Sequence, residues 1–212
     1  MITLNKIKPA PLSQVAIQAS AMWDKECKFK KGKYYLIKAP SGTGKTTLIH
    51  LLYGMRNDYQ GTLSFDNRDT RSFDVDDWSE LRQQKISIVF QDLRLFGKLT
   101  ARENIQLKWD LGSEIKQGEI NEMASTLGVA DILDKPCDIL SYGQQQRVAI
   151  IRALCQPFDF LLLDEPFSHL DLDNIRIATE VIDRIVKKNN AGLILVSLGQ
   201  PFYFDYNKEI EL

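Results

Sequence analysis

The sequence of 212 residues contains few cysteines and histidines, three of the first and two of the second. Cys27, Cys137 and Cys155 are far apart in the chain, so they fit neither a disulfide framework nor the close ligand spacing of a zinc site. We expect three buried free thiols, as in a protein of a reducing compartment.

Long apolar runs are also absent. The longest clean run, Ala191–Val196, falls far short of the roughly 18 residues that a membrane-spanning helix requires. Residues 1–9 contain no apolar segment of the kind that a signal peptide carries. We therefore expect a cytoplasmic protein.

Neither sign of charge is in excess, because 27 Lys and Arg balance 28 Asp and Glu to a net charge of −1. This balance excludes a strongly basic nucleic-acid binder, although it leaves room for a local basic patch. Hydrophobic residues make up 44% of the chain and charged residues 26%, which is ordinary for a globular protein and excludes a disordered one.

Four short apolar segments are nearly continuous, which is typical of strands covered on both faces of a parallel sheet. They are Tyr34–Ala39, Ile86–Phe90, Phe158–Leu163 and Ala191–Val196. Apolar residues recur at helical spacing across residues 178–186, and we expect that helix to have ended by Gly192. The alternation of strands and helices predicts an α/β fold with a mostly parallel sheet.

Two segments do not fit this core. Residues 58–80 are polar and include an alternating strand with a turn near Asp66 and Asn67, which predicts a small antiparallel β layer. The apolar spacing in residues 97–140 predicts a helical insert. We interpret 1–212 as one domain, with its core at about 1–92 and 141–212 and a helical subdomain at about 93–140.

A glycine-rich segment follows the first predicted strand and precedes a helical pattern, which is the setting of a phosphate-binding P-loop. Glycine lets the backbone turn its N–H groups toward phosphate oxygens, and the helix N-terminus adds positive potential. Lys45 would reach the β- and γ-phosphates, and the Thr46 hydroxyl would bind Mg²⁺. Ala39 occupies the first glycine position of the pattern, which is a mild departure. The predicted phosphate-binding residues are Pro40, Ser41, Gly42, Thr43, Gly44, Lys45, Thr46 and Thr47.

Two acidic residues end the apolar run that begins at Phe158. Asp164 occupies the position of a Walker B carboxylate, which reaches Mg²⁺ directly or through water. Glu165 is next to it and can polarise an attacking water. Such acids could serve only to solvate the end of a strand, but the P-loop upstream favours the catalytic interpretation.

The segment Leu140-Ser141-Tyr142-Gly143-Gln144 precedes another helical pattern. Ser141 and Gln144 have the spacing of a capping box, so this segment predicts a helix N-terminus. A hydroxyl and a bare glycine at a helix start form a second phosphate-binding surface, and one chain would then carry two half-sites.

These motifs together resemble the ATP-binding subunit of ABC transporters. Leu140–Gln144 is similar to the family's signature motif, Gln91 to its Q-loop glutamine, and Ser168–Asp171 to its D-loop. The resemblance runs in order from about residue 15 to about residue 200. Within the family, chain length and the segment Val89–Phe96 are most similar to the lipoprotein-release, macrolide-export and cell-division group.

The resemblance implies an ABC-type ATPase with a P-loop NTPase core. Two such domains would face each other head to tail, with ATP between the P-loop of one and Ser141, Gly143 and Gln144 of the other. It implies Mg²⁺ bound through Thr46, Gln91 and Asp164, and catalysis by Glu165, Gln91 and Lys45. The partners would be a second ATP-binding subunit, identical or a paralogue, and a membrane-spanning permease. The chain would then be peripheral on the inner face of the cell membrane.

The sequence departs from the family pattern at three places. Tyr142 replaces the first signature glycine, and Leu198 stands where the family has a switch histidine. No aromatic residue lies within 11–17, where one would stack on adenine; Trp23 could be a displaced substitute, but core packing is our preferred interpretation. Loss of a donor at position 198 predicts slow hydrolysis, since such losses typically cost ~10²–10³ in rate.

Three functions remain open from the sequence. The chain could be a hydrolysing motor of a transporter, a poorly hydrolysing regulatory or structural subunit, or a non-transport ABC protein acting on nucleic acid or ribosomes. The balanced charge argues against the third. We expect Leu93–Leu99 to form an exposed apolar patch that docks the membrane partner, unless its side chains fill the subdomain's own core.

Overall fold

The computed structural model describes residues 1–40, 42–112 and 114–212. Its central element is a five-stranded parallel sheet in the order β6-β7-β8-β3-β9. The strands are β3 (Tyr34–Lys38), β6 (Ile86–Val89), β7 (Phe160–Asp164), β8 (Gly192–Ser197) and β9 (Lys208–Glu211). The four strands that the apolar runs predicted are all present, and their parallel arrangement is confirmed.

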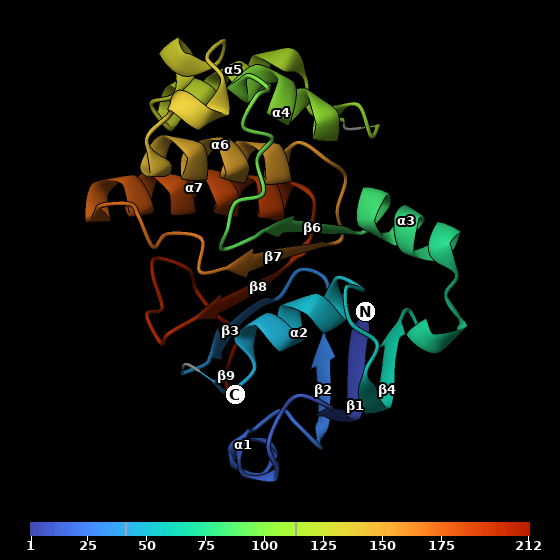
Figure 1. The fold of residues 1–212 in the computed structure, drawn as a ribbon. Helices are drawn as coiled ribbons and strands as arrows, with labels where there is room; N and C mark the ends of the chain where they lie inside the picture. The colour runs from blue at the N-terminus through green and yellow to red at the C-terminus, as the bar shows by residue number, and fades with distance from the viewer. Residues whose placement is uncertain (41, 113) are drawn as a thin grey trace.

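The two faces of this sheet belong to two hydrophobic cores. Leu161 and Leu163 of β7 pack in one cluster, whereas Leu162 packs in the other. Figure 1 shows α6 (Tyr142–Leu154) and α7 (Leu172–Lys188) over one face and α2 (Lys45–Leu52) over the opposite face. Because both faces are covered, the strands read as continuous apolar runs.

A second, antiparallel sheet has the order β2-β1-β4-β5. It consists of β1 (Ile2–Pro9), β2 (Glu26–Phe29), β4 (Tyr59–Phe65) and β5 (Arg68–Asp69). The turn between β4 and β5 is formed by Asp66 and Asn67, with φ of 47° and 69°. Positive φ at both central residues is typical of a tight hairpin, so the predicted turn is confirmed.

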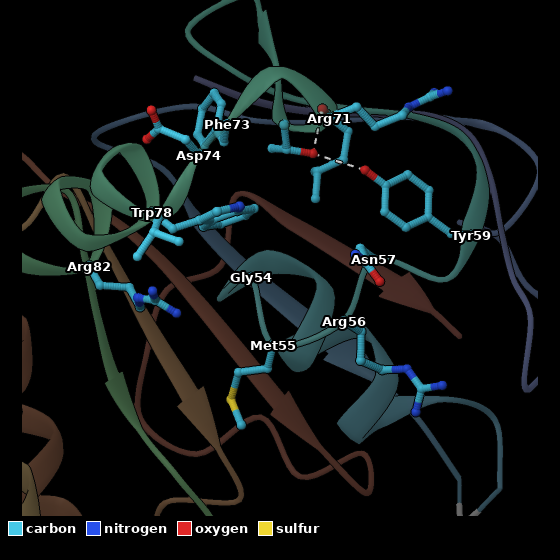
Figure 2. Close-up of a pocket in the computed structure, with 13 residues that line it drawn as sticks. Gly54, Met55, Arg56, Asn57, Tyr59, Arg71, Phe73, Asp74, Trp78 and Arg82 are labelled. Carbon is cyan, nitrogen blue, oxygen red and sulfur yellow. Dashed lines mark hydrogen bonds between the residues drawn. The ribbon is translucent and has the colours of Figure 1, made fainter.

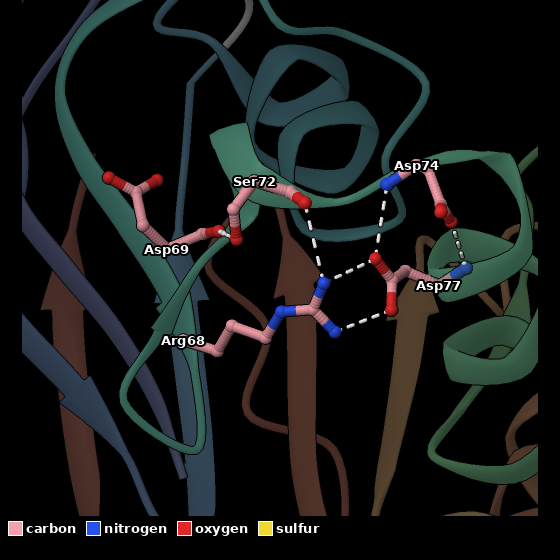
Figure 3. A network of polar contacts seen from close by, with 5 residues as sticks. All are labelled: Arg68, Asp69, Ser72, Asp74 and Asp77. Atoms are coloured by element: carbon pink, nitrogen blue, oxygen red, sulfur yellow. Dashed lines mark hydrogen bonds and ion pairs between the residues drawn. The ribbon is translucent and has the colours of Figure 1, made fainter.

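The prediction of a β layer across residues 58–80 is wrong beyond β5. A short 3₁₀ helix, η1 (Thr70–Ser72), and the helix α3 (Val75–Gln84) follow instead. Asp74 caps α3, and its capping box with Asp77 is the local signal for a helix start. The Arg68 guanidinium binds both carboxylate oxygens of Asp77 at 2.5 Å, which ties β5 to α3 (Figure 3).

Strand β1 was not predicted, because a bulge shifts its pattern. Ile2 and Leu4 are buried, but Lys6 has a φ of 52°, and the next buried residue is Ile7. The shift breaks the alternation by which a strand of this kind is recognised. The short helix α1 (Gln14–Ala19), which Ser13 caps, follows β1.

The helical insert is confirmed. It contains α4 (Ala101–Trp109), α5 (Gln117–Thr126) and the 3₁₀ helices η2 (Ala130–Ile132) and η3 (Cys137–Ile139). Met123, Ala124 and Leu127, which carried the helical spacing, are buried. In Figure 1 these helices lie beyond α6, on the side away from the sheet.

The helix predicted around residues 178–186 is α7, which ends at Lys188. The chain turns from α7 toward β8 at Asn190, which has a φ of 47°, and Gly192 is the first residue of β8. Gly192 is needed for space, since a Cβ there would lie 2.7 Å from the ring of Phe160.

The three cysteines are buried and free, as expected. Within residues 1–40, 42–112 and 114–212, none of the helices has the length and apolar character needed to cross a membrane.

Candidate functional site

The P-loop connects β3 to α2, as the sequence predicted. Gly42 and Gly44 have φ of 83° and 108°, angles that residues with a Cβ rarely adopt. In the part of the chain that the structure describes, no side chain caps the N-terminus of α2. The first N–H groups of this helix are therefore left for an anion. Thr43 donates from its hydroxyl to the Pro40 carbonyl at 2.8 Å, whereas Ser41 lies outside the described residues.

Trp23 packs against the P-loop on the side of the core. The indole is fully buried and donates from Nε1 to the Thr43 carbonyl at 3.2 Å. A Cβ on Gly44 would lie 3.3 Å from the Trp23 ring and 2.9 Å from Leu12. Trp23 is therefore a core residue, in agreement with our preferred interpretation, and its buried ring is not available to stack on a base. Its contact with the loop had no signal in the sequence.

Lys45 and Glu165 form an ion pair, with Nζ 2.7 Å from Oε1. Both side chains are largely shielded from solvent, with 12% and 16% exposed. Glu165 follows β7 directly, and its φ of 44° turns the chain at the strand end. The Glu165 N–H donates to the Val196 carbonyl at 3.1 Å, which fixes this turn against β8.

Asp164 ends β7 and is only 4% exposed. Its Oδ1 is buried and has no hydrogen-bond partner among the described residues. Burial, followed by the charge of Glu165, raises the pKa of Asp164 to about 6. Thr46 and Gln91 line the same cavity as this buried carboxylate, and the oxygens of the three side chains are a donor set that fits a hard cation such as Mg²⁺.

Two adjoining cavities meet at Thr46 and Gln91. One, of about 400 Å³, has a lining that includes Asp164 and Tyr142. The other, of about 510 Å³, is lined by the P-loop and α2 residues Gly42, Gly44, Lys45 and Thr47 and by Glu165 and Leu198. The structure therefore brings together the side chains predicted for catalysis and metal binding, Lys45, Thr46, Gln91, Asp164 and Glu165.

The predicted signature residues lie apart from these cavities. Ser141 caps α6 and forms the expected capping box with Gln144. Neither these two nor Gly143 line the P-loop cavities in a single chain. The exception in this segment is Tyr142, whose hydroxyl donates to the Gln91 carbonyl at 3.1 Å. In the sequence, Tyr142 was only a departure from the signature glycine, and nothing indicated this contact.

Leu198 lines the P-loop cavity beside Glu165 and Gln91 and is 63% exposed. An apolar side chain therefore occupies the place that we expected for a missing donor. The described lining of this cavity includes Pro11 and Leu12 but no aromatic residue.

The prediction for Leu93–Leu99 needs correction. Leu93 is 2% exposed and Leu95 packs against the core, so these leucines fill the interior. Phe96 alone among the apolar residues of this segment is well exposed, at 60%. The Asn104 side chain of α4 binds the Phe96 N–H and carbonyl at 2.8 Å and 3.1 Å and so holds Phe96 at the surface.

A third cavity, of about 610 Å³, lies between the end of α2 and α3 (Figure 2). Trp78 packs on Gly54, where a Cβ would lie 2.3 Å from the ring, and Arg82 and Met55 line the same space. Among the described residues, none of those predicted to bind phosphate or metal lines this cavity. It is therefore distinct from the P-loop site.

A family model described as "ABC transporter" matches residues 24–168. An uncharacterized ABC transporter ATP-binding protein, YvcR of Bacillus subtilis, is 31% identical over 92% of this chain and 75% of its own length. The thiamine import ATP-binding protein ThiQ of Vibrio parahaemolyticus is 36% identical over 69% of this chain and 61% of its own length. ABC transporter H family member 2 of Dictyostelium discoideum is 34% identical over 83% of this chain, and the match spans 36% of that longer protein.

Solved structures resemble this chain over most of its length. A bacterial ABC transporter cassette described as dimeric superposes with a TM-score of 0.79 at 26% identity, covering 93% of this chain and 88% of that one. A post-hydrolysis form of the same cassette, bound to ADP and Pi, superposes with a TM-score of 0.76 at 26% identity and the same coverage.

Proposed function

Because this chain belongs to the ABC transporter family, as an ATP-binding subunit and ABC-type ATPase, we propose that it binds MgATP at the P-loop and drives a membrane partner. The observation that carries this proposal is the convergence of five side chains. Lys45 and Thr46 begin α2, Gln91 follows β6, and Asp164 and Glu165 close β7. They meet at two adjoining cavities beside uncapped helix N–H groups.

Each of these groups has a distinct role in the proposal. The loop N–H groups and Lys45 hold the phosphates, with Lys45 on the β- and γ-phosphates. Thr46, Gln91 and Asp164 would hold Mg²⁺, which would neutralise charge on the transferring phosphoryl group. Glu165 polarises the attacking water, and Gln91 positions it.

The second half of the nucleotide site comes from another subunit. Ser141, Gly143 and Gln144 line neither P-loop cavity in their own chain, although they lie at the start of α6, where Ser141 is exposed and the other two are half-buried. A head-to-tail pair would bring them to the phosphates bound by the partner. The dimeric ABC cassette that this chain resembles supports such a pair.

The membrane partner is a permease subunit, which would place the chain on the inner face of the cell membrane. Phe96 and Met55 are exposed at 60% and 40%, and Arg94 connects their segments by a contact of its Nη1 to the Met55 sulfur at 3.5 Å. Arg94 also lines the cavity of Gln91, so these exposed apolar side chains suit a partner that responds to the nucleotide.

The partner site is tested with Phe96→Asp. This change should separate the subunit from a co-expressed permease in detergent while leaving ATP affinity unchanged. Val75→Asp is the matched control, because Val75 is 81% exposed on α3. Equal capture of the permease by wild type and Phe96→Asp would contradict this assignment of the surface.

A second function, an ATP-binding subunit that hydrolyses poorly, is favoured by Leu198. Its exposed apolar side chain lies at the P-loop cavity, where a donor to the γ-phosphate would act. The rate of phosphate release by the chain with its permease at saturating MgATP separates the two functions. A hydrolysing motor releases phosphate rapidly, whereas a poorly hydrolysing subunit releases it slowly.

The nucleotide site itself is tested by titration with a fluorescent ATP analogue. Lys45→Ala removes a charge-assisted contact, worth about 1.5–3 kcal/mol, so we expect affinity to fall about 10- to 100-fold. Lys38→Ala, in an ion pair with Glu209 at the end of β3, is the control. Unchanged affinity in Lys45→Ala would contradict the assignment.

A further inference from the structure

The side chain of Tyr142 joins three segments of the chain: the start of α6, the loop after β6 and the turn after β7. Its hydroxyl donates to the Gln91 carbonyl at 3.1 Å. Its ring lies on the His169 ring, with 4.1 Å between centroids and 49° between planes. The first residue of α6 therefore contacts both the loop after β6 and the turn after β7 within one chain.

Helix α6 holds the same loop at a second point. The Arg152 guanidinium, 9% exposed, donates to the Leu93 carbonyl at 2.5 Å and to the Arg94 carbonyl at 2.6 Å. Tyr142 and Arg152 lie at opposite ends of α6. One rigid helix thus binds three carbonyls of the segment 91–94.

This loop needs such support because its backbone is strained. Leu93 and Arg94 have φ of 56° and 49°, a conformation that residues with a Cβ adopt at an energetic cost. Conformations of this kind persist where surrounding contacts hold them. The bonds from α6 supply these contacts, and Tyr142 supplies the one nearest Gln91.

We propose that Tyr142 is a positioning residue, which holds Gln91 at the metal site and couples it to α6 within the same subunit. The proposal rests on the proposed role of Gln91 in binding MgATP. Tyr142 and Gln91 line the same cavity as Thr46 and Asp164. Movement of α6 toward a nucleotide on the partner subunit would then move the Gln91 backbone. A glycine at position 142 has no side chain to make this connection.

The first test uses Tyr142→Phe, which keeps the ring against His169 and removes only the hydroxyl. We expect amide hydrogens of Leu93 and Arg94 to exchange about 2- to 10-fold faster in the nucleotide-free protein, as for the loss of one hydrogen bond. Both amides are bonded within the loop, to the Phe90 and Asp92 carbonyls. Tyr203→Phe is the matched control, since Tyr203 is 55% exposed and distant from Gln91 in sequence. Unchanged exchange in Tyr142→Phe would overturn the proposal.

The second test separates positioning from a structural role by steady-state kinetics. Tyr142→Phe should lower kcat and raise the Mg²⁺ concentration for half-maximal rate about 2- to 10-fold, because Gln91 is held less firmly. The KM for ATP at saturating Mg²⁺ should stay unchanged, because the P-loop contacts are intact. Faster exchange with unchanged Mg²⁺ dependence in an active enzyme would overturn the proposal. A wild type that fails to bind MgATP would contradict the proposed function instead, and exchange would still report whether Tyr142 holds the loop.

Discussion

Lys45 Nζ and Glu165 Oε1 lie 2.7 Å apart in a largely shielded ion pair. The cation expected on the phosphates thus neutralises the carboxylate expected to activate water. A bound triphosphate would attract Lys45 away from Glu165, because its charge is larger and the helix N-terminus holds it close. Binding of the nucleotide would then free the base that acts on it.

Glu165→Gln should retain nucleotide and lose turnover. The amide keeps the shape of the side chain, cannot act as a base, and no longer competes for Lys45. We expect ATP affinity to be equal or higher and kcat to fall by ~10²–10⁴, the usual contribution of a general base. Phosphate release and titration with a fluorescent ATP analogue measure the two effects. Glu180→Gln on α7, which breaks an exposed pair with Arg176, is the control. A kcat equal to wild type would mean that Glu165 is not the base.

Trp23→Phe should destabilise the protein and weaken nucleotide binding together. The change removes the donor to the Thr43 carbonyl and leaves unfilled space behind Gly44. We expect a loss of about 1–3 kcal/mol in the free energy of unfolding and a measurable loss of ATP affinity. Trp109→Phe is a matched control, because Trp109 Nε1 also donates to a carbonyl, that of Ile115, at 2.7 Å but lies on α4. An equal loss of ATP affinity in both variants would contradict a specific role for Trp23.

The sequence predicted the parallel sheet and the P-loop because their signals are local. The strand Phe160–Asp164 is a continuous apolar run, and the loop has its glycines in a fixed spacing. The contacts of Trp23 with Thr43 and of Tyr142 with Gln91 join residues 20 and 51 positions apart. No local pattern encodes such pairs, since they depend on how separate elements pack.

Two of the three errors have causes in the backbone conformation. The strand β1 was missed because the bulge at Lys6 changes which residues face the core. Leu93 and Leu95 were predicted to be exposed, but Leu93 has a φ of 56° and is buried in the core. Hydropathy alone does not report backbone conformation.

Lys108→Met should stabilise the protein at neutral pH. Burial lowers the pKa of Lys108 to about 8, and the charges of Arg152 and Arg82 add to the effect. The charged form is therefore disfavoured in the folded state, and replacing it with methionine should increase the free energy of unfolding by up to about 3 kcal/mol. Urea denaturation at pH 7 measures this gain. Lys98→Met, at a side chain that is 95% exposed, should give no comparable gain.

The same residue gives a pH dependence of known sign. Below pH 8, Lys108 is charged in both the folded and the unfolded protein. The full free-energy cost of burying that charge then lowers the stability of the folded protein. Between about pH 8 and its ordinary value of 10.5, the folded protein releases the proton first, and stability from this group rises with pH. The advantage of Lys108→Met should therefore shrink as the pH approaches 10. A constant advantage across this range would show that packing, and not charge, causes it.

Leu198→His should accelerate hydrolysis. Leu198 lines the P-loop cavity with Glu165 and Gln91, and 63% of its side chain is exposed, so a histidine there has room to reach the γ-phosphate. A restored donor stabilises the charge that develops in the transition state, and we expect turnover to rise by up to ~10²-fold. The measurement is steady-state phosphate release by the chain with the proposed permease at saturating MgATP. Leu172→His is the control, since Leu172 is 73% exposed and lines the neighbouring apolar cavity with Leu198 but does not line the P-loop cavity. An unchanged or lower rate in a folded Leu198→His protein would mean that Leu198 does not limit hydrolysis.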